Sequence, residues 1–495
     1  MEDDLGQELA ANLRGEVRFD MASRAVYAGS ALAVRQLPLG VVLPWDGDDT
    51  VRAFELCRAR GVPIVSRGAG TSLEGQTSIA AVVIDFSKHM NAIHALDPAS
   101  GSARVEPGVV LDALRDRAEP HGLTFGPDPV THGHCTLGGM IGNNSCGAHS
   151  ARWGDTADNL HALEVLTYHG AHFTAGPTSE ADFDAIARAD DGHARIYRRV
   201  REFRDRWAAV IRAGLAAAPS RPDRTALAAL LPENGTHVAR ALCRSEGTLV
   251  AVLSAELRLV SAPAARRLVA LGYESAYDVA AHLDLVVASA PLGVEALDET
   301  RLADATDGEL PGGHGWLLVE LGAGSVSEAE ARARALLDQL AAAARPPTAK
   351  LCDAAEAAAL WRARESAPDA LPRAAGIDLA LAPESLAKAL PELRALLARF
   401  GYRASLCGHL SRGCLHLSIP LELDHSAHLA RFESFLEHAA DLAAAHGGAL
   451  CGGPVRADAR ARLLQRTRSP ELARAFAEWK EIWDPTQRMN PGRAL

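Results

Sequence analysis

Closely spaced cysteines are missing from this chain. Eight cysteines occur among 495 residues, and no two of them form a Cys-x-x-Cys pair. Cysteines that are scattered through a long chain indicate neither a disulfide scaffold nor the ligand set of an iron–sulfur cluster, so we expect neither here.

Long apolar runs and an excess of basic residues are missing as well. No apolar stretch approaches the length of a membrane span, and the first residues, Met1-Glu-Asp-Asp-Leu5, lack the apolar core of a signal peptide. The 51 basic and 62 acidic residues give a net charge of −11, which disfavours attraction to nucleic acid or to an anionic membrane. We therefore expect a cytoplasmic protein with no nucleic-acid partner and no membrane span.

What the chain does contain is typical of a large globular protein. Hydrophobic residues make up 48% and charged residues 23% of the sequence, which is the usual balance of a folded domain. With 495 residues, the chain is long enough to form two or three domains.

A glycine-rich segment lies between two apolar runs near the N-terminus. Residues 67–76 read Arg-Gly-Ala-Gly-Thr-Ser-Leu-Glu-Gly-Gln, with apolar runs at 62–65 and 81–86. The short gap leaves no room for a useful helix, so the segment is not an ordinary Rossmann turn. Its glycines leave backbone N–H groups bare, and we expect these groups and the neighbouring hydroxyls to hold a diphosphate.

A second glycine-rich segment covers residues 136–147. It reads Thr-Leu-Gly-Gly-Met-Ile-Gly-Asn-Asn-Ser-Cys-Gly. We interpret it as a loop whose small side chains let a flat ring system lie against the backbone. The two segments together indicate a bound flavin.

This pair of segments resembles the FAD-binding fold of the vanillyl-alcohol-oxidase or p-cresol-methylhydroxylase (PCMH) type. The chain is similar in particular to the branch of D-lactate dehydrogenases, glycolate oxidase flavoprotein subunits and D-2-hydroxyglutarate dehydrogenases. Further blocks agree in order, namely Gly126-Pro-Asp-Pro129, Leu231-Pro-Glu-Asn-Gly235, Ser245-Glu-Gly-Thr248, Leu360-Trp-Arg-Ala-Arg-Glu365, Trp483-Asp-Pro485 and Arg488-Met-Asn-Pro-Gly492. The resemblance therefore extends over nearly the whole chain.

The resemblance implies an α+β fold with a PCMH-type FAD-binding domain and an α/β cap domain of the FAD-linked oxidase C-terminal type. We predict a lead-in at 1–36, the FAD-binding domain at 37–262, the cap at 263–450, and a segment at 451–495 that returns to the flavin. Amphipathic helical patterns alternate with strand patterns in the cap region, so we expect a sheet with helices on one side.

Periodicity and capping residues predict the main elements. Helices are expected from Asp48 until Gly61 and at 112–121, 327–343, 383–400 and 427–446. Strands are expected at 81–86, 103–107, 163–167, 316–321 and 415–419.

The resemblance also implies the cofactor and its contacts. The 67–76 segment lacks the histidine to which relatives attach flavin covalently, so we expect non-covalent FAD, with Cys146 as the only nearby thiol. The residues expected to bind FAD are Arg67, Gly68, Ala69, Gly70, Thr71, Ser72, Gly75, Pro129, Thr136, Gly138, Gly139, Gly142, Asn143, Asn144, Ser145, Gly147, Glu246, Gly247 and Asn490.

Two active-site signatures of the 2-hydroxy-acid dehydrogenases are altered here. Their metal-binding hairpin, His-x-Gly-Asp-Gly-x-x-His, reads His409-Leu-Ser-Arg-Gly-Cys-Leu-His416, with Ser411 and Arg412 in place of glycine and aspartate. Their Glu-His-Gly segment supplies a further ligand and the base, whereas Gly453-Pro454 stands in that place. Glycine and proline neither ligate a metal nor accept a proton, and the Arg412 cation would repel a metal. We therefore expect no bound metal.

One alternative keeps a metal at His409 and His416. Cys407, Cys414 and Cys451 lie near the altered motifs in sequence, and thiolates with imidazoles suit zinc. Cysteines more often serve as small buried hydrophobic residues, which is the simpler interpretation.

The catalytic candidates are His409, His416, Arg364, His132 and His134. A family arginine at the position of Arg364 clamps a substrate carboxylate, and the alternative is an ion pair with Glu365 or a charge on the helix surface. His132 and His134 are candidate replacement bases because imidazole titrates near neutral pH, and the alternative is a solvated surface position.

Three functions stay open at this point. The first is an FAD-dependent oxidoreductase that passes hydride from a small-molecule substrate to the flavin N5, related to D-2-hydroxy-acid dehydrogenases but acting on a different substrate of specialised metabolism. The second is a metal-assisted D-2-hydroxy-acid dehydrogenase, and the third is a flavin-binding protein with non-redox chemistry. Electrons are expected to pass to oxygen or to a separate acceptor. The sequence leaves the oligomeric state open, with a homodimer as one option.

Overall fold

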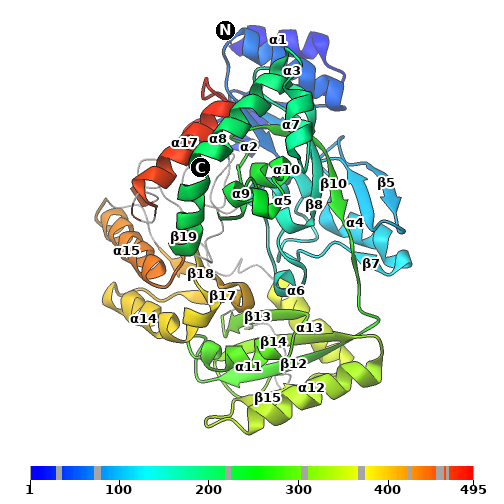
Figure 1. The fold of residues 1–495 in the computed structure, drawn as a ribbon. Coiled ribbons are helices and arrows are strands. Elements are labelled where there is room, and N and C mark those ends of the chain that lie inside the picture. The colour runs from blue at the N-terminus through cyan, green and yellow to red at the C-terminus, as the bar shows by residue number, and fades with distance from the viewer. Residues whose placement is uncertain are drawn as a thin grey trace.

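A four-stranded sheet and a five-stranded sheet lie in the N-terminal half of the chain (Figure 1). The structure, a computed structural model, describes residues 2–28, 36–71, 80–217, 224–300, 302, 310–365, 374–421, 426–452, 462–463, 466 and 468–493. The first sheet contains, in spatial order, β1 (Glu16–Arg18), β2 (Gly40–Leu43), β4 (Val82–Asp85) and β3 (Ile64–Arg67). The second contains β5 (Ile93–Asp97), β6 (Ser102–Val105), β10 (Ala251–Arg258), β8 (Leu160–Leu166) and β9 (His172–Ala175).

The first sheet carries the first glycine-rich segment. β3 and β4 are parallel neighbours, and residues 68–71, which follow β3, contain no helix. The predicted helix beginning near Asp48 is α3 (Gly47–Ala59), where the Asp46 side chain accepts the Asp49 N–H. The two predicted strands are confirmed. The absence of a Rossmann helix between them stays a prediction, since residues 72–79 lie outside the described residues.

The remaining elements of this half are mostly helical. They are α1 (Glu2–Asn12), α2 (Met21–Tyr27), α4 (Leu111–Ala118), α5 (Leu137–Asn143), α6 (Ser150–Trp153), α7 (Glu180–Ile186), α8 (Gly192–Ala217), α9 (Arg224–Ala228), α10 (Val238–Leu242) and the short strands β7 (Leu123–Thr124) and β11 (Val260–Ser261). The predicted helix at 112–121 ends early and continues as a 3-10 turn, because Pro120 cannot donate the next α-helical hydrogen bond.

The second glycine-rich segment is partly helical, so the prediction of a loop is wrong there. The Thr136 side chain caps α5, and the helix ends where Asn144 adopts a φ of 51°. Leu137 and Met140 pack into the core of this half. The cap and the buried side chains offset the low helix propensity of the glycines.

The end of the chain returns to the N-terminal half. Helix α17 (Pro470–Trp483) packs along α8 (Figure 1), and Trp479 belongs to the same core as Phe203. Beyond α17, Met489 forms a parallel bridge with Ile64 at the edge of the first sheet. The C-terminal segment therefore braces the strand from which the first glycine-rich segment leaves.

One antiparallel sheet of eight strands forms the C-terminal half. In spatial order its strands are β15 (Thr348–Leu351), β12 (Ala265–Tyr273), β14 (Gly315–Ala323), β13 (Gly293–Asp298), β17 (Ser405–His409), β18 (Cys414–Pro420), β16 (Ala374–Ala380) and β19 (Ala449–Gly452). Its helices are α11 (Leu283–Ala288), α12 (Val326–Ala341), α13 (Ala354–Glu365), α14 (Leu386–Arg399) and α15 (Ser426–Ala445). The cap helices and strands predicted from periodicity are confirmed.

Helices cover both faces of this sheet, so the prediction of helices on one side is wrong for α13. Most helices enclose one apolar core with side chains such as Val269. On the opposite face, Leu360 of α13 packs against Leu268 and Leu318. Because the central strands are apolar on both faces, each face needs a cover.

The domain boundaries proposed from the sequence stay predictions. No helix within the described ranges is both long enough and apolar enough to cross a bilayer.

Candidate active site

The two glycine-rich segments line one cleft, together with residues of the Ser245-Glu-Gly-Thr248 block. The cleft has a volume of about 1110 Å³ when its open side is included. The predicted FAD-binding residues that line it are Arg67, Gly68, Ala69, Gly70, Thr71, Thr136, Gly138, Gly139, Gly142, Asn143, Ser145, Glu246 and Gly247. The fold thus brings together most of the residues that the sequence assigned to the cofactor.

Glycine is required where the first segment meets α5. A Cβ at Gly68 would lie 2.1 Å from Thr136 Oγ1, and a Cβ at Gly138 would lie 2.6 Å from the Cβ of Pro107. Gly70 adopts a φ of 72°, which L side chains rarely adopt. At Gly142, by contrast, a Cβ would have no neighbour within 4 Å. The backbone of α5 is therefore bare on the side that faces the cleft.

The cleft offers hydrogen-bond donors that no protein group uses. Within the described residues, the backbone N–H groups of Gly68, Ala69 and Gly70 make no hydrogen bond. The Ser66 hydroxyl, at the same edge, is buried without a partner in that part of the chain. Such donors fit a diphosphate, and the bare backbone of α5 fits a flat ring, so the residues present fit FAD.

Four predicted FAD contacts do not line this cleft. The Asn144 side chain accepts the Ala157 N–H at 2.8 Å, and Gly147 packs so closely on Asp128 that a Cβ would lie 2.0 Å from its carbonyl oxygen. Asn490 Nδ2 donates to the Glu246 carbonyl at 2.7 Å and so supports the cleft from behind. Pro129 is the fourth predicted FAD contact that does not line the cleft. Ser72 and Gly75 lie outside the described residues.

Several residues of the cleft wall were missed by the sequence. They are Ser66, Phe86, Pro107, Thr131, Cys135, Met140, Ile141, Leu242, Ser245, Val250 and Val252. Most are apolar residues of ordinary core elements, and no local signal separates them from other core positions. Met140, Ile141 and Ser245 stood in segments that the resemblance had singled out.

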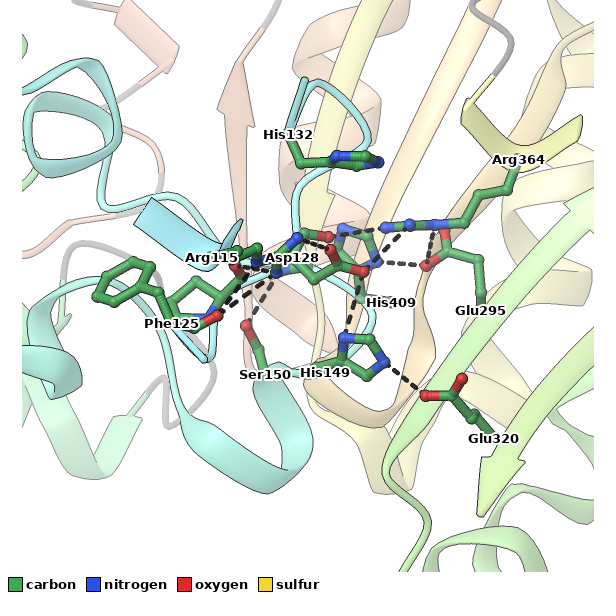
Figure 2. A network of polar contacts seen from close by, with 12 residues as sticks. Arg115, Phe125, Asp128, His132, His149, Ser150, Glu295, Glu320, Arg364 and His409 are labelled. Atoms are coloured by element: carbon green, nitrogen blue, oxygen red, sulfur yellow. Dashed lines mark hydrogen bonds and ion pairs between the residues drawn. The ribbon is translucent and has the colours of Figure 1, made fainter. Parts of the chain in front are cut away.

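A buried polar network joins the two halves of the chain (Figure 2). Arg364 of α13 donates from Nη1 to Asp128 Oδ2 at 3.2 Å and from Nη2 to the Asp128 carbonyl at 2.8 Å. Its Nε lies 3.4 Å from Glu295 Oε2 on β13. Arg115 approaches the other Asp128 oxygen at 2.8 Å. Burial opposes the charge of Asp128, but these cations and His149 hold its pKa well below the usual value.

The network bears on the expectation that Arg364 clamps a substrate carboxylate. The side chain is only 2% exposed, and its donors face Asp128 and Glu295 rather than open space. The nearest carboxylates to its guanidinium are those of Asp128 and Glu295, while Glu365 lies 3.1 Å from His132 Nε2 and adds to the negative charge around Arg364. Arg364 therefore acts in this structure as a link between the halves.

His149, which precedes α6, was missed by the sequence. Its Nε2 lies 2.8 Å from Glu320 Oε2 on β14, and its Nδ1 lies 3.2 Å from Asp128 Oδ2. Burial lowers its pKa, but the two carboxylates raise it more, so the net shift is upward. Asp128 and Glu320 are far from His149 in sequence, so only the fold could identify it.

His409 and His416 lie together, as the hairpin motif implies, but in different environments. Their ring centroids are 5.3 Å apart. His409 is buried, and its Nδ1 is 2.7 Å from Glu295 Oε2. The His416 side chain is 34% exposed, and its Nδ1 is 2.6 Å from Asp378 Oδ1 on the neighbouring strand. His416 is therefore the more accessible of the two.

Asp378 controls the protonation of His416. Burial lowers the pKa of His416, but the charge and hydrogen bond of Asp378 raise it to about 9. Because this pKa lies above the value of about 6.5 in unfolded chains, the pair stabilises the fold below about pH 6.5 and loses that effect as pH rises through 9. Asp378→Asn should therefore lower the unfolding temperature more at about pH 6 than at about pH 10. Thermal unfolding of both proteins at the two pH values checks this, and an equal loss at both would contradict it.

The two loop histidines are in contrasting positions. His132 is held between Asp112, at 2.7 Å from its Nδ1, and Glu365. Burial lowers its pKa, but the two carboxylates raise it overall. Because the two carboxylates favour the protonated ring, they weaken His132 as a candidate base. His134 is exposed to solvent, so nothing in its surroundings supports the predicted catalytic role.

Two thiols meet where the halves join. Cys146 and Cys414 have their sulfur atoms 3.8 Å apart. The hydrogen bond with Cys414 lowers the pKa of Cys146 against the effect of burial, and the charges of His409 and His416 help. Cys146 is thus the thiol with the most thiolate character in this pair.

The surroundings of His409 and His416 bear on the alternative that these two residues hold a metal. Among the described residues, no group of three His, Cys, Asp or Glu side chains is arranged to hold a metal ion. The Nδ1 atoms of His409 and His416 each face a carboxylate, and Arg412 pairs with Asp155 at 2.9 Å. Gly453 and Pro454 lie outside the described residues.

Comparison with known proteins gives a consistent result. The family described as FAD binding domain matches residues 38–176, and the C-terminal domain of FAD linked oxidases matches residues 262–494. D-2-hydroxyglutarate dehydrogenase of Pseudomonas putida is 28% identical over 516 residues, which cover 98% of this chain and 51% of that protein. The glycolate oxidase subunit GlcD of Bacillus subtilis is 27% identical over 505 residues, which cover 98% of this chain and 96% of that protein.

The fold comparison agrees. The structure of p-cresol methylhydroxylase with substrate bound has a TM-score of 0.71 at 12% identity and covers 99% of this chain and 96% of that one. The chain spans about half the length of the D-2-hydroxyglutarate dehydrogenases that it matches. With the glycine-lined cleft and two matched domains in one shared fold, the chain belongs to the family of FAD-linked oxidases and dehydrogenases, and FAD is its cofactor.

Proposed function

We propose that this chain holds FAD non-covalently and oxidises a small-molecule substrate other than D-lactate or D-2-hydroxyglutarate, in specialised metabolism. The proposal rests on a difference between the FAD cleft and two of the predicted catalytic residues. The FAD cleft keeps its bare backbone and backbone donors that no described residue accepts from, whereas Arg364 and His409 are buried and engaged by Asp128 and Glu295.

His416 is the histidine best placed to contact the substrate. It is partly exposed, and Asp378 fixes its ring from the neighbouring strand. When bound, FAD supplies the hydride acceptor. His416 would hydrogen-bond a substrate oxygen and hold a proton at its ring, which is the role that an electropositive group plays beside a reacting alcohol.

The test is anaerobic reduction of the bound flavin, followed by its absorbance. Some alcohol in a broad panel should bleach the flavin, while D-lactate and D-2-hydroxyglutarate should not. With that substrate, His416→Gln should slow bleaching about 100-fold, the lower end of acid–base effects. His172→Gln, on an exposed histidine paired with Glu164, is the matched control and should not. Rapid bleaching of the flavin by D-2-hydroxyglutarate would contradict the proposal.

A second candidate is a metal-assisted D-2-hydroxy-acid dehydrogenase. The names of the relatives favour it, and the glycolate oxidase subunit matches over almost its whole length. In that case, D-2-hydroxyglutarate or glycolate should bleach the flavin, and a chelator should stop the reaction. The electron acceptor, a homodimer and a cytoplasmic location stay predictions.

A further inference from the structure

Two cysteines from different halves of the chain face each other beside the FAD cleft. Cys146 follows α5, which lines the cleft, and its neighbour Ser145 lines the cleft as well. Cys414 is the first residue of β18 in the large sheet. Their sulfur atoms lie 3.8 Å apart although 268 positions separate the two residues in sequence.

Accessibility separates this pair from most other thiols. Cys57, Cys135, Cys243, Cys352 and Cys407 are buried, whereas Cys146, Cys414 and Cys451 are partly exposed. Cys451 lies on β19, at the edge of the same sheet, and its sulfur contacts the Ala449 carbonyl at 3.4 Å. A sulfenic acid closes into a disulfide where an accessible cysteine has a second thiol at its side. Cys146 and Cys414 meet both conditions.

We propose that Cys146 and Cys414 form a peroxide-sensitive thiol pair that closes into a disulfide between the two halves. The Cys146 thiolate attacks one oxygen of hydrogen peroxide, and the O–O bond breaks to give a sulfenic acid and, after protonation, one water. The Cys414 sulfur then attacks the sulfenic sulfur, the S–O bond breaks, and a second water leaves. Two thiols are oxidised to one disulfide, and one peroxide is reduced to two waters.

Closing the bond needs only a local movement. The sulfur atoms must approach from 3.8 Å to about 2.0 Å, which rotation of the two side chains and a small backbone shift can supply. The disulfide would tie the segment after α5 to β18, and so fix the cap sheet against the cleft. Thiol reductants would reverse it.

Trypsin can separate the relevant thiols. Cleavage after arginine places Cys414 in residues 413–431 and Cys451 in residues 432–456. Cys146 shares residues 118–152 with the buried Cys135, so fragment ions are needed to assign it.

The experiment treats the full chain with equimolar hydrogen peroxide, blocks remaining thiols, and maps peptides without reduction. The expected result is loss of two free thiols and a cross-link between 118–152 and 413–431 that fragments at Cys146. Cys414→Ser should abolish the cross-link and leave a sulfenic acid at Cys146 that a dimedone probe labels. Cys451→Ser, the matched control, should keep the cross-link. A bond between Cys414 and Cys451, a bond through Cys135, or eight unchanged thiols would overturn the proposal.

Discussion

Gly142→Leu is expected to give a folded protein that does not hold FAD. Gly142 lies in α5 and lines the cleft, and a Cβ added there has no neighbour within 4 Å outside its own helix among the described residues. Leucine would therefore enter the space that the flavin needs without disturbing the core, and it favours the helix more than glycine does. We expect FAD affinity to fall at least about 100-fold, or roughly 2.7 kcal/mol. Flavin absorbance of the purified protein and a fluorescence titration measure the loss.

The chain offers a matched control for this substitution. Gly47 is also a helical glycine with no neighbour within 4 Å of an added Cβ, but it lies at the start of α3 and does not line the cleft. Gly47→Leu should keep full FAD occupancy. Stoichiometric flavin in purified Gly142→Leu would show that this cleft is not the FAD site.

Arg364→Met is expected to lower the free energy of unfolding by about 3–5 kcal/mol, the usual cost of breaking a buried ion pair. The substitution keeps a long apolar side chain but removes the cation between Asp128 and Glu295. Arg364 and Glu295 are 2% and 0% exposed, so water cannot replace the lost partner. Urea unfolding at equilibrium measures the change.

Two further variants separate this effect from simple loss of packing. Arg362→Met, on an exposed residue of the same helix, should change stability by less than about 0.5 kcal/mol. Adding Glu295→Gln to Arg364→Met should recover part of the loss, because the uncompensated buried charge is then removed. If Arg364→Met and Arg362→Met unfold alike, the network does not hold the halves together.

The cofactor cleft was predictable because its signal is local. The glycines at 68, 70, 138 and 142 lie in two short segments that apolar residues flank. The first segment follows a strand, the second forms a helix, and both line the cleft. The helix α5 was missed because its glycines are typical of loops, while its stability comes from a cap and from buried partners. Local propensity carries no information on those partners.

The roles of charged residues were not predictable in the same way. Arg364 stands next to Glu365 in sequence, yet its partners are Asp128, which is 236 positions away, and Glu295. The same holds for His149 with Glu320, at a separation of 171 positions. A buried charge needs an opposite charge close to it in space, and the residue that supplies it can come from any part of the chain. Sequence distance does not limit that choice.

The sequence by itself determined the family, the FAD cofactor and the α+β architecture, since these depend on glycine spacing and on the periodicity of apolar residues. Only the tertiary structure decided that Arg364 and His409 are buried and engaged, that His416 stays accessible beside Asp378, and that Cys146 meets Cys414. Backbone conformation follows from short-range sterics and hydrogen bonding, which neighbouring residues specify. Ionisation and reactivity follow from burial and from charges within a few ångströms, which depend on the packing of segments far apart in the chain.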